Sequence, residues 1–238
     1  MTRRAVFAHG FAQTSRSWDR IIGQLAGLDA IAVDLPGHGH AHEVVADLWG
    51  TADHLVRSGG RGAYVGYSMG GRVALHAAIA HPDVVERLAL IGATAGIDDD
   101  GERAARRAAD ERLAERIEAV GVETFVDEWL TNPLFAGLDA ESAMRDDRLR
   151  NTVAGLASSL RTCGTGTQQP LWERLVDIVC PTLVIVGERD TKFRALGQRL
   201  VDGIADSELV VIPDSGHSVH LEQPEATTAV LADFVGRG

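Results

Sequence analysis

Residues 66–70 read Gly-Tyr-Ser-Met-Gly, a G-x-S-x-G pentapeptide that follows an apolar segment and precedes a stretch with helical spacing. A serine in this context lies on a sharp strand-to-helix turn with a strained backbone, which exposes its hydroxyl at the end of a sheet. Such a turn needs positions without side chains two residues before and after the serine, and Gly66 and Gly70 supply them. Because an ordinary glycine turn can have the same pattern, a role for Ser68 depends on partners elsewhere in the chain.

Short apolar segments alternate with longer amphipathic ones along most of the chain. The apolar segments predict buried strands at residues 5–9, 30–34, 63–67, 88–91, 182–186 and 209–212. The amphipathic segments predict helices at residues 18–28, 43–57, 72–80, 192–203 and 225–234. This alternation indicates an α/β fold with a mostly parallel, doubly wound sheet, in which ligands bind beyond the carboxyl ends of the strands.

The alternation is interrupted once, by a charged and helical stretch without strand signals. We therefore expect a sheet domain of residues 1–96 and 172–238 and an inserted helical cap of residues 97–171. A length of 238 residues with 45% hydrophobic content suits one domain with such an insertion.

The amino-acid composition limits the classes of partner that the protein can bind and the cellular compartment that it suits. No run of about 18 apolar residues predicts a membrane span, and the apolar stretch near Met1 is too short for a signal peptide. Cys163 and Cys180 lack C-x-x-C spacing, which suits a reduced, cytoplasmic protein. A formal charge of −11 argues against nucleic acid and anionic membrane surfaces. An anionic small substrate would need a local cluster of arginines.

Two further residues complete a possible catalytic triad with Ser68. Asp190 and His217 each follow a predicted strand, and the order Ser, Asp, His is the one expected on an α/β-hydrolase sheet. A neutral imidazole can accept the serine proton, and a buried carboxylate can fix the imidazole tautomer. Asp190 could instead cap the following helix, and Asp214 could be the acid. We favour Asp190 because Asp214 is too near His217 in sequence to reach behind its ring.

Other residues near the strand ends are candidates for an oxyanion hole, for the wall of a pocket or for a turn. The backbone N–H groups of Phe11 and Met69 could form an oxyanion hole, since Phe11 follows His-Gly after the first strand. We interpret His220 as a pocket or surface residue. His38, His40 and His42 suggest a turn, because no acidic or thiol partner repeats at metal-ligand spacing, and no metal site is expected.

Together these residues resemble the α/β-hydrolase superfamily over essentially the whole chain, with the usual leading strands shortened or absent. Several segments are similar to a narrower family, the 2-succinyl-6-hydroxy-2,4-cyclohexadiene-1-carboxylate synthases of menaquinone (vitamin K2) biosynthesis. In the sheet domain these segments are residues 34–39, 66–72, 187–194 and 216–224. In the cap they are Arg106-x-x-x-Asp110, Trp129-x-x-x-Pro133-x-Phe135 and Arg150-Asn151.

The resemblance implies a lyase that eliminates pyruvate without a metal or organic cofactor. Ser68 would remove the ring proton next to the succinyl ketone, and the oxyanion hole would hold the resulting enolate. The substrate carries three carboxylates. The family's substrate-binding residues carry over onto Tyr67, Arg72, Arg106, Trp129 and Arg150.

Residue spacing gives an independent argument for Arg106. This residue falls on the same helical stripe as Ala109, Leu113, Ile117 and Val120, so it is expected on the inward face. A salt bridge to Asp110, four residues later, is the structural alternative.

Two rival functions stay open at this point. One is a serine-triad hydrolase for an ester, thioester or carbon–carbon bond, and the other is a non-catalytic ligand receptor. In either case we expect a monomer or a weak homo-oligomer.

Overall fold

The fold is built on one six-stranded sheet. The computed structural model describes residues 3–237. Its strands are β1 (Arg3–Ala8), β2 (Leu28–Val33), β3 (Gly62–Tyr67), β4 (Val85–Ile91), β5 (Thr182–Gly187) and β6 (Ser207–Ile212). They lie in the order β2-β1-β3-β4-β5-β6, and every pairing among the described residues is parallel. All carboxyl ends therefore meet at one edge of the sheet.

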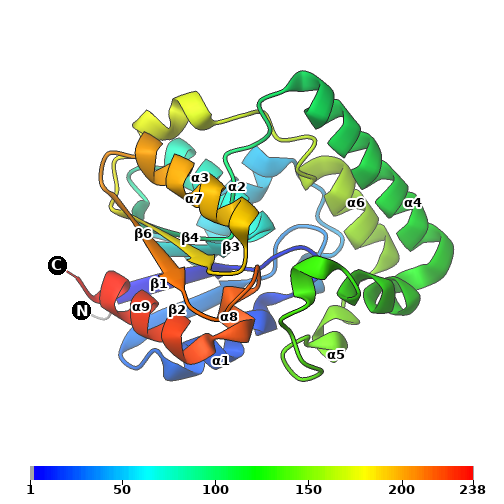
Figure 1. Cartoon of the computed structure of the whole chain (residues 1–238), viewed down its shortest axis with the longest axis horizontal. Helices are drawn as coiled ribbons and strands as arrows, with labels where there is room; N and C mark the ends of the chain where they lie inside the picture. The colour runs from blue at the N-terminus through cyan, green and yellow to red at the C-terminus, as the bar shows by residue number, and fades with distance from the viewer. Residues whose placement is uncertain (1–2, 238) are drawn as a thin grey trace.

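Helices cover both faces of the sheet (Figure 1). The α2 (Leu48–Gly59), α3 (Met69–Ala80) and α7 (Thr191–Gly203) helices bury their apolar residues against one face. The α1 (Asp19–Gln24) and α9 (Pro224–Gly236) helices cover the other face. Val6 and Ala8 of β1 belong to the first core cluster and Ala5 and Phe7 to the second, because successive strand side chains point to opposite faces. A strand covered on both faces is apolar throughout.

All six predicted strands are present, whereas two of the predicted helices differ from the observed ones by at least four residues at one end. The first predicted helix stops at Gln24, because Gly27 adopts a positive φ of 82° and Leu28 already begins β2. The second begins at Leu48, where the Asp47 side chain caps the helix by accepting from the Gly50 N–H. The predicted α/β fold is confirmed.

Residues 97–171, between the fourth and fifth strands, contain three helices and a short 3-10 turn. They are α4 (Asp100–Leu130), η3 (Pro133–Phe135), α5 (Arg145–Arg148) and α6 (Val153–Cys163). The α4 and α6 helices lie side by side beyond the end of the sheet (Figure 1), and their apolar residues form a separate core cluster that includes Ala12 of the sheet domain. A kink at Gly121, with φ 80° and ψ 169°, divides α4. The remaining short elements are η1 (Ser15–Trp18), η2 (Gly39–Ala41), η4 (Trp172–Asp177) and α8 (Val219–Glu222).

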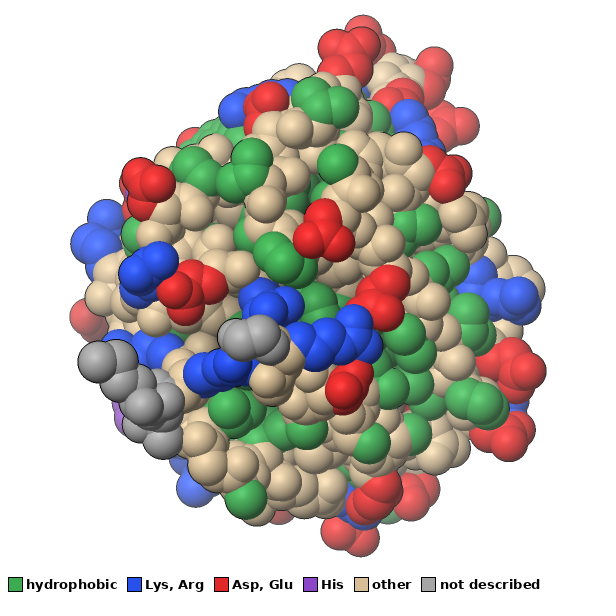
Figure 2. Space-filling view, turned by 90° about the vertical axis from the view of Figure 1, so that its left-hand side faces the viewer, with side chains coloured by type: hydrophobic (Ala, Val, Ile, Leu, Met, Phe, Trp, Pro, Cys, Tyr) green, Lys and Arg blue, Asp and Glu red, His purple; other side chains and the backbone are tan. Residues whose placement is uncertain are grey.

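The face that carries both described chain ends has mixed charge. Figure 2 shows basic side chains next to acidic ones on this face. Near the chain ends, Arg4 pairs with Asp29, and Arg237 pairs with both Glu208 and Asp233. Within residues 3–237, no helix is long and apolar enough to cross a membrane.

Candidate active site

Ser68 lies at the turn between β3 and α3. Its backbone has φ 51° and ψ −107°, a strained conformation that a non-glycine residue adopts rarely. Two close backbone approaches maintain the turn: a Cβ atom on Gly66 would meet the Gly70 carbonyl, and one on Gly70 would meet the Ala8 carbonyl. The glycines that flank the serine are therefore required by space, as the sequence predicted.

The structure brings Ser68, His217 and Asp190 into one hydrogen-bonded chain. His217 Nε2 lies 3.3 Å from Ser68 Oγ, and His217 Nδ1 lies 2.8 Å from Asp190 Oδ2. The side chains of His217 and Asp190 are only 4% and 9% exposed. A carboxylate in this position selects the tautomer in which Nδ1 carries the proton and Nε2 can accept one from the serine.

Asp190 also caps a helix, so the two interpretations made from the sequence describe one residue. Its Oδ1 accepts from the Phe193 N–H at 3.1 Å, which fixes the carboxylate at the start of α7. Its other oxygen remains for His217. Asp214 is exposed and pairs with Arg189 at 2.8 Å, so it has no contact with the imidazole.

His220 and His38 are both buried outside the triad. His220 is 1% exposed, its ring packs against Trp18 and Tyr67, and neither ring nitrogen has a hydrogen-bond partner. It is therefore not a surface residue, and the pocket that it lines is a separate one, with Arg16 and Glu225, rather than the cavity at Ser68. His38 is buried in the loop where the sequence predicted a turn, and burial lowers its pKa to about 3. Among the described residues, no group of three or more His, Cys, Asp or Glu could hold a metal ion.

The two proposed oxyanion residues, Phe11 and Met69, border the same cavity as Ser68. Met69 is the first residue of α3, so its N–H has no acceptor within the helix. The loop around Phe11 is held firmly: Ala12 has a φ of 58°, and its N–H donates to His38 Nε2 at 3.2 Å. Both N–H groups are thus on rigid segments beside the serine.

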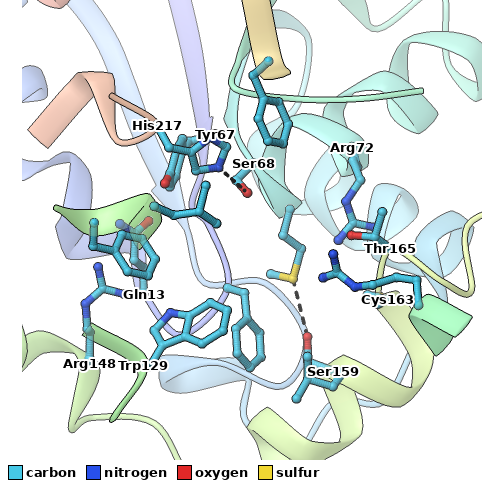
Figure 3. A pocket seen from close by; sticks show the side chains of 18 of the residues that line it. Gln13, Tyr67, Ser68, Arg72, Trp129, Arg148, Ser159, Cys163, Thr165 and His217 are labelled. Carbon is cyan, nitrogen blue, oxygen red and sulfur yellow. Dashed lines mark hydrogen bonds between the residues drawn. The ribbon is translucent and has the colours of Figure 1, made fainter. Parts of the chain in front are cut away.

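A cavity of about 160 Å³, partly open to solvent, lies beside Ser68 (Figure 3). Its wall combines loops of the sheet domain with residues of the helical region. The residues lining it include Phe11, Gln13, Tyr67, Arg72, Arg106, Trp129, Phe135, Arg148, Lys192, Phe193 and His217. Four of the five substrate-binding residues predicted from the sequence are in this set.

Arg72 and Arg106 differ in their surroundings. Arg72 is 7% exposed, its Nη1 has no hydrogen-bond partner, and burial lowers its pKa to about 10. Arg106 Nε donates to Asp110 Oδ1 at 2.8 Å, and its side chain is 44% exposed. The inward placement predicted for Arg106 is therefore only partly correct, because Asp110 takes the buried position and Arg106 lies at the cavity mouth.

Arg150 does not line the cavity, and its predicted placement there is corrected. Its side chain is 40% exposed, and its Nε lies 4.0 Å from Asp147 Oδ1. Arg148, two residues earlier, is 0% exposed and borders the cavity instead. Arg148 ends α5, whereas Arg150 lies beyond the C-cap residue Leu149 and outside the helix.

A second cavity adjoins the first and shares with it Ser68, Arg72 and Arg106. Its lining includes the acidic residues Asp98, Asp99 and Glu102, and Asp98 pairs there with Arg199. Ser68 therefore borders two adjoining cavities.

The sequence reasoning missed Gln13, Arg148, Lys192 and Phe193 as lining residues. Lys192 and Phe193 lie two and three residues after Asp190, so their proximity to a triad residue was a usable signal. Gln13 lies in a loop and Arg148 ends a helix of a single turn, so periodicity gives no information about either residue.

Comparisons with known proteins agree with this geometry. Residues 5–230 match the model of the alpha/beta hydrolase family. A Bacillus subtilis (strain 168) protein with the provisional name 2-succinyl-6-hydroxy-2,4-cyclohexadiene-1-carboxylate synthase is 35% identical over 246 residues, covering 97% of this chain and 89% of the relative. The synthase of that name from Salmonella paratyphi C (strain RKS4594) is 32% identical, with 97% and 92% covered. This chain belongs to that synthase family, on the α/β-hydrolase fold.

Solved structures also show how widely the fold is shared. MenH from S. aureus superposes with a TM-score of 0.91 at 31% identity, covering 99% of this chain and 94% of that one. A thermophilic esterase from Thermogutta terrifontis superposes with a TM-score of 0.83 at 27% identity, covering 98% and 89%. The scaffold by itself therefore does not select elimination over hydrolysis.

Proposed function

We propose that this protein is a carbon–oxygen lyase that eliminates pyruvate from 2-succinyl-5-enolpyruvyl-6-hydroxy-3-cyclohexene-1-carboxylate. The product is 2-succinyl-6-hydroxy-2,4-cyclohexadiene-1-carboxylate, an intermediate of menaquinone biosynthesis. One observation carries the assignment: the Ser68–His217–Asp190 chain opens onto a cavity whose buried wall holds Arg72 with an unpaired Nη1. Burial of the Arg72 guanidinium costs hydration free energy. A carboxylate of the substrate can offset this cost, whereas a neutral ester cannot.

The geometry supports elimination in the following way. His217 accepts the hydroxyl proton of Ser68, and the activated oxygen removes the ring proton next to the succinyl ketone. The electrons of that C–H bond form an enolate, whose oxygen accepts from the N–H groups of Phe11 and Met69. The enolate then collapses through the existing ring double bond: a new double bond forms at the succinyl-bearing ring carbon, the existing one shifts by one position, and the C–O bond to the enolpyruvyl group breaks. That group leaves, takes up a proton and becomes pyruvate.

Residues 97–171 act in this proposal as a cap that shields the reaction from water. Support comes from Trp129 and Phe135, which this region contributes to the cavity wall, and from its own apolar cluster packed on Ala12. We further propose that the enzyme works in the cytoplasm, as a monomer or weak homo-oligomer, without a nucleic-acid or membrane partner. The strongly negative charge supports the last point.

The test supplies the purified protein with the enolpyruvyl substrate and, separately, with a panel of p-nitrophenyl esters. Pyruvate is followed by a coupled dehydrogenase, and nitrophenol by absorbance. We expect rapid pyruvate release that is lost in Ser68→Ala, and slow ester cleavage. Fast nitrophenol release without pyruvate would instead identify a hydrolase related in activity to the esterases that share the fold.

A further inference from the structure

A carboxylate outside the triad lies against the loop that carries His217. Glu222 ends α8, five residues after His217, and its side chain folds back toward that loop. Its Oε2 accepts from the Gly216 N–H at 2.7 Å, and its Oε1 accepts from the Ser218 N–H at 3.0 Å. Each oxygen therefore holds one of the two residues that flank His217.

Capping of α8 explains only one of these two hydrogen bonds. Ser218 is the N-cap residue of α8, and a carboxylate about one turn later can reach back to its N–H. Gly216 lies outside the helix, on the other side of His217, so its N–H is not one of the groups that a helix cap satisfies. Because a charged acceptor forms stronger hydrogen bonds than a neutral one, the carboxylate holds the backbone of His217 firmly from both sides.

The Glu222 carboxylate is closely confined between the cap and the loop. A Cβ atom on Gly137, just beyond η3, would collide with the carboxylate. A Cβ atom on Gly216 would lie 3.2 Å from its Oε1. Both positions are glycines, and the carboxylate occupies the space that side chains would need.

The segment after His217 is also joined to the strand that leads to Ser68. Tyr67 ends β3, and its hydroxyl lies 2.8 Å from Ser218 Oγ. Its ring centre lies 5.4 Å from that of His217, next to the serine (Figure 3). His217 Nε2 is already 3.3 Å from Ser68 Oγ, so a further backbone shift of about 0.5 Å would take the imidazole out of hydrogen-bond range.

We propose that Glu222 is a positioning residue that acts through His217. Its two hydrogen bonds to the Gly216 and Ser218 N–H groups, named the carboxylate brace below, keep the imidazole between Asp190 and Ser68. Glu222 is not among the described residues that line the cavity beside Ser68, so it acts without touching a substrate there. The brace would serve a hydrolase equally well, because any reaction in which His217 accepts the serine proton needs the same alignment.

The reactivity of Ser68 tests the brace without the natural substrate. With diisopropyl fluorophosphate, Ser68 Oγ forms a bond to phosphorus, fluoride leaves, and His217 takes up the hydroxyl proton. Intact-protein mass spectrometry gives the rate of this modification in the wild-type protein, Glu222→Ala, Glu222→Gln and the matched control Glu225→Gln.

The three variants should rank by how much of the brace they retain. We expect Glu222→Ala to react about 100-fold more slowly than wild type, as a misplaced catalytic group does. Glu222→Gln should react about tenfold more slowly, because its amide retains one acceptor and turns a donor toward the second N–H. Glu225→Gln should react within about twofold of wild type, since Glu225 is exposed and pairs with Arg20.

Three further readouts separate alignment from folding. The proton resonance of His217 Nδ1–H, which reports its hydrogen bond to Asp190, should shift or broaden in Glu222→Ala and stay unchanged in Glu225→Gln. The melting temperature of Glu222→Ala should fall by only about 2–4 °C, because a partly exposed loop loses two hydrogen bonds. In the pyruvate assay, kcat should fall with KM within about twofold of wild type.

The brace is overturned if Glu222→Ala reacts with the fluorophosphate at the wild-type rate. If Glu222→Ala does not fold, Glu222→Gln has nearly the same shape and decides the question in the same way. A wild-type Ser68 that does not react at all would contradict an aligned triad, and the brace with it.

Failure of the brace can be told apart from failure of the proposed function. If the wild-type protein releases pyruvate and Glu222→Ala does so with an unchanged kcat, the elimination stands and the brace is wrong. If the wild-type protein releases no pyruvate but the reactivity of Ser68 depends on Glu222, the brace stands and the substrate assignment is wrong.

Discussion

Asp190 has two structural tasks at the scale of single atoms. One oxygen caps α7 through the Phe193 N–H, and the other holds the His217 imidazole. This division makes the two contributions separable by mutation, because asparagine can still cap a helix but cannot stabilise an imidazolium.

Asp190→Asn should therefore retain stability and lose activity. We expect kcat to fall by about 10⁴-fold, as the wrong imidazole tautomer is then favoured. Asp190→Ala should lose a similar factor and also about 1 kcal/mol of unfolding free energy, since the cap is removed. Urea unfolding and pyruvate assays on both variants check this. Equal stability of the two variants would show that the cap contributes nothing.

Arg106 should contribute to substrate binding less than a buried cation would. Its side chain is nearly half exposed and already paired with Asp110, so the net value of a substrate contact is about 1 kcal/mol. We expect Arg106→Ala to raise KM by about fivefold with kcat nearly unchanged. Steady-state kinetics measures both constants, and Arg107→Ala is the control because Arg107 does not line the cavity. A large fall in kcat would mean that Arg106 acts in the transition state.

At the scale of elements, the strands that are buried on both faces of the sheet were predicted most accurately from the sequence. Strands such as β3 and β5 are buried along their whole length, so they stand out as apolar segments. Ser68, Asp190 and His217 could be located because each follows such a strand. Helix ends were less accurate, since they depend on single capping residues such as Asp47.

The cap region shows where sequence reasoning reached its limit. Arg148 and Arg150 lie in one charged run, on or just beyond a four-residue helix that begins after Met144 in a left-handed conformation. A helix of one turn has no repeated hydrophobic positions, so composition cannot tell which arginine faces inward. Only the tertiary contacts of Asp147 and Asn151 with the loop at Gln13 decide it.

The kink in α4 gives a prediction at the level of one helix. Gly121 has a backbone conformation that is nearly exclusive to glycine, whereas no atom lies within 4 Å of a Cβ placed there. Gly121→Ala should thus cost about 1–3 kcal/mol from backbone strain alone. Gly23 of α1 also has open space but lies in a helix, so Gly23→Ala should be neutral or slightly stabilising. Thermal unfolding of the two variants separates the effect of backbone strain from the effect of the space available for a Cβ atom. Equal melting temperatures would contradict the prediction.

At the scale of the whole molecule, buried neutral histidines make the free energy of unfolding depend on pH. Burial lowers the pKa of His38 and His220 to about 3 and that of His76 to about 4. In the unfolded chain their pKa is about 6.5, so between these values the unfolded state binds more protons. Their stabilising effect is full above pH 6.5 and is lost as the pH falls toward 3.

Each such histidine should add roughly 1.4 kcal/mol of unfolding free energy per pH unit in that window. His220 makes no hydrogen bond through its ring, so His220→Phe removes one proton linkage without removing a partner. Urea unfolding at pH 7.5, 6 and 5 should give a slope that is smaller by about 1.4 kcal/mol per unit in the variant. An identical slope would mean that His220 is protonated in the folded protein.

The acidic residues Asp98, Asp99 and Glu102 in the lining of the second cavity have a kinetic consequence. A polyanion diffusing toward a molecule of charge −11 is repelled at long range, before it reaches the arginines inside. Dissolved salt screens this repulsion beyond about 10 Å at 0.1 M ionic strength, so encounter should quicken when salt is first added. The second-order rate of substrate capture should accordingly pass through a maximum with ionic strength, the reverse of the monotonic decline seen when opposite charges steer association.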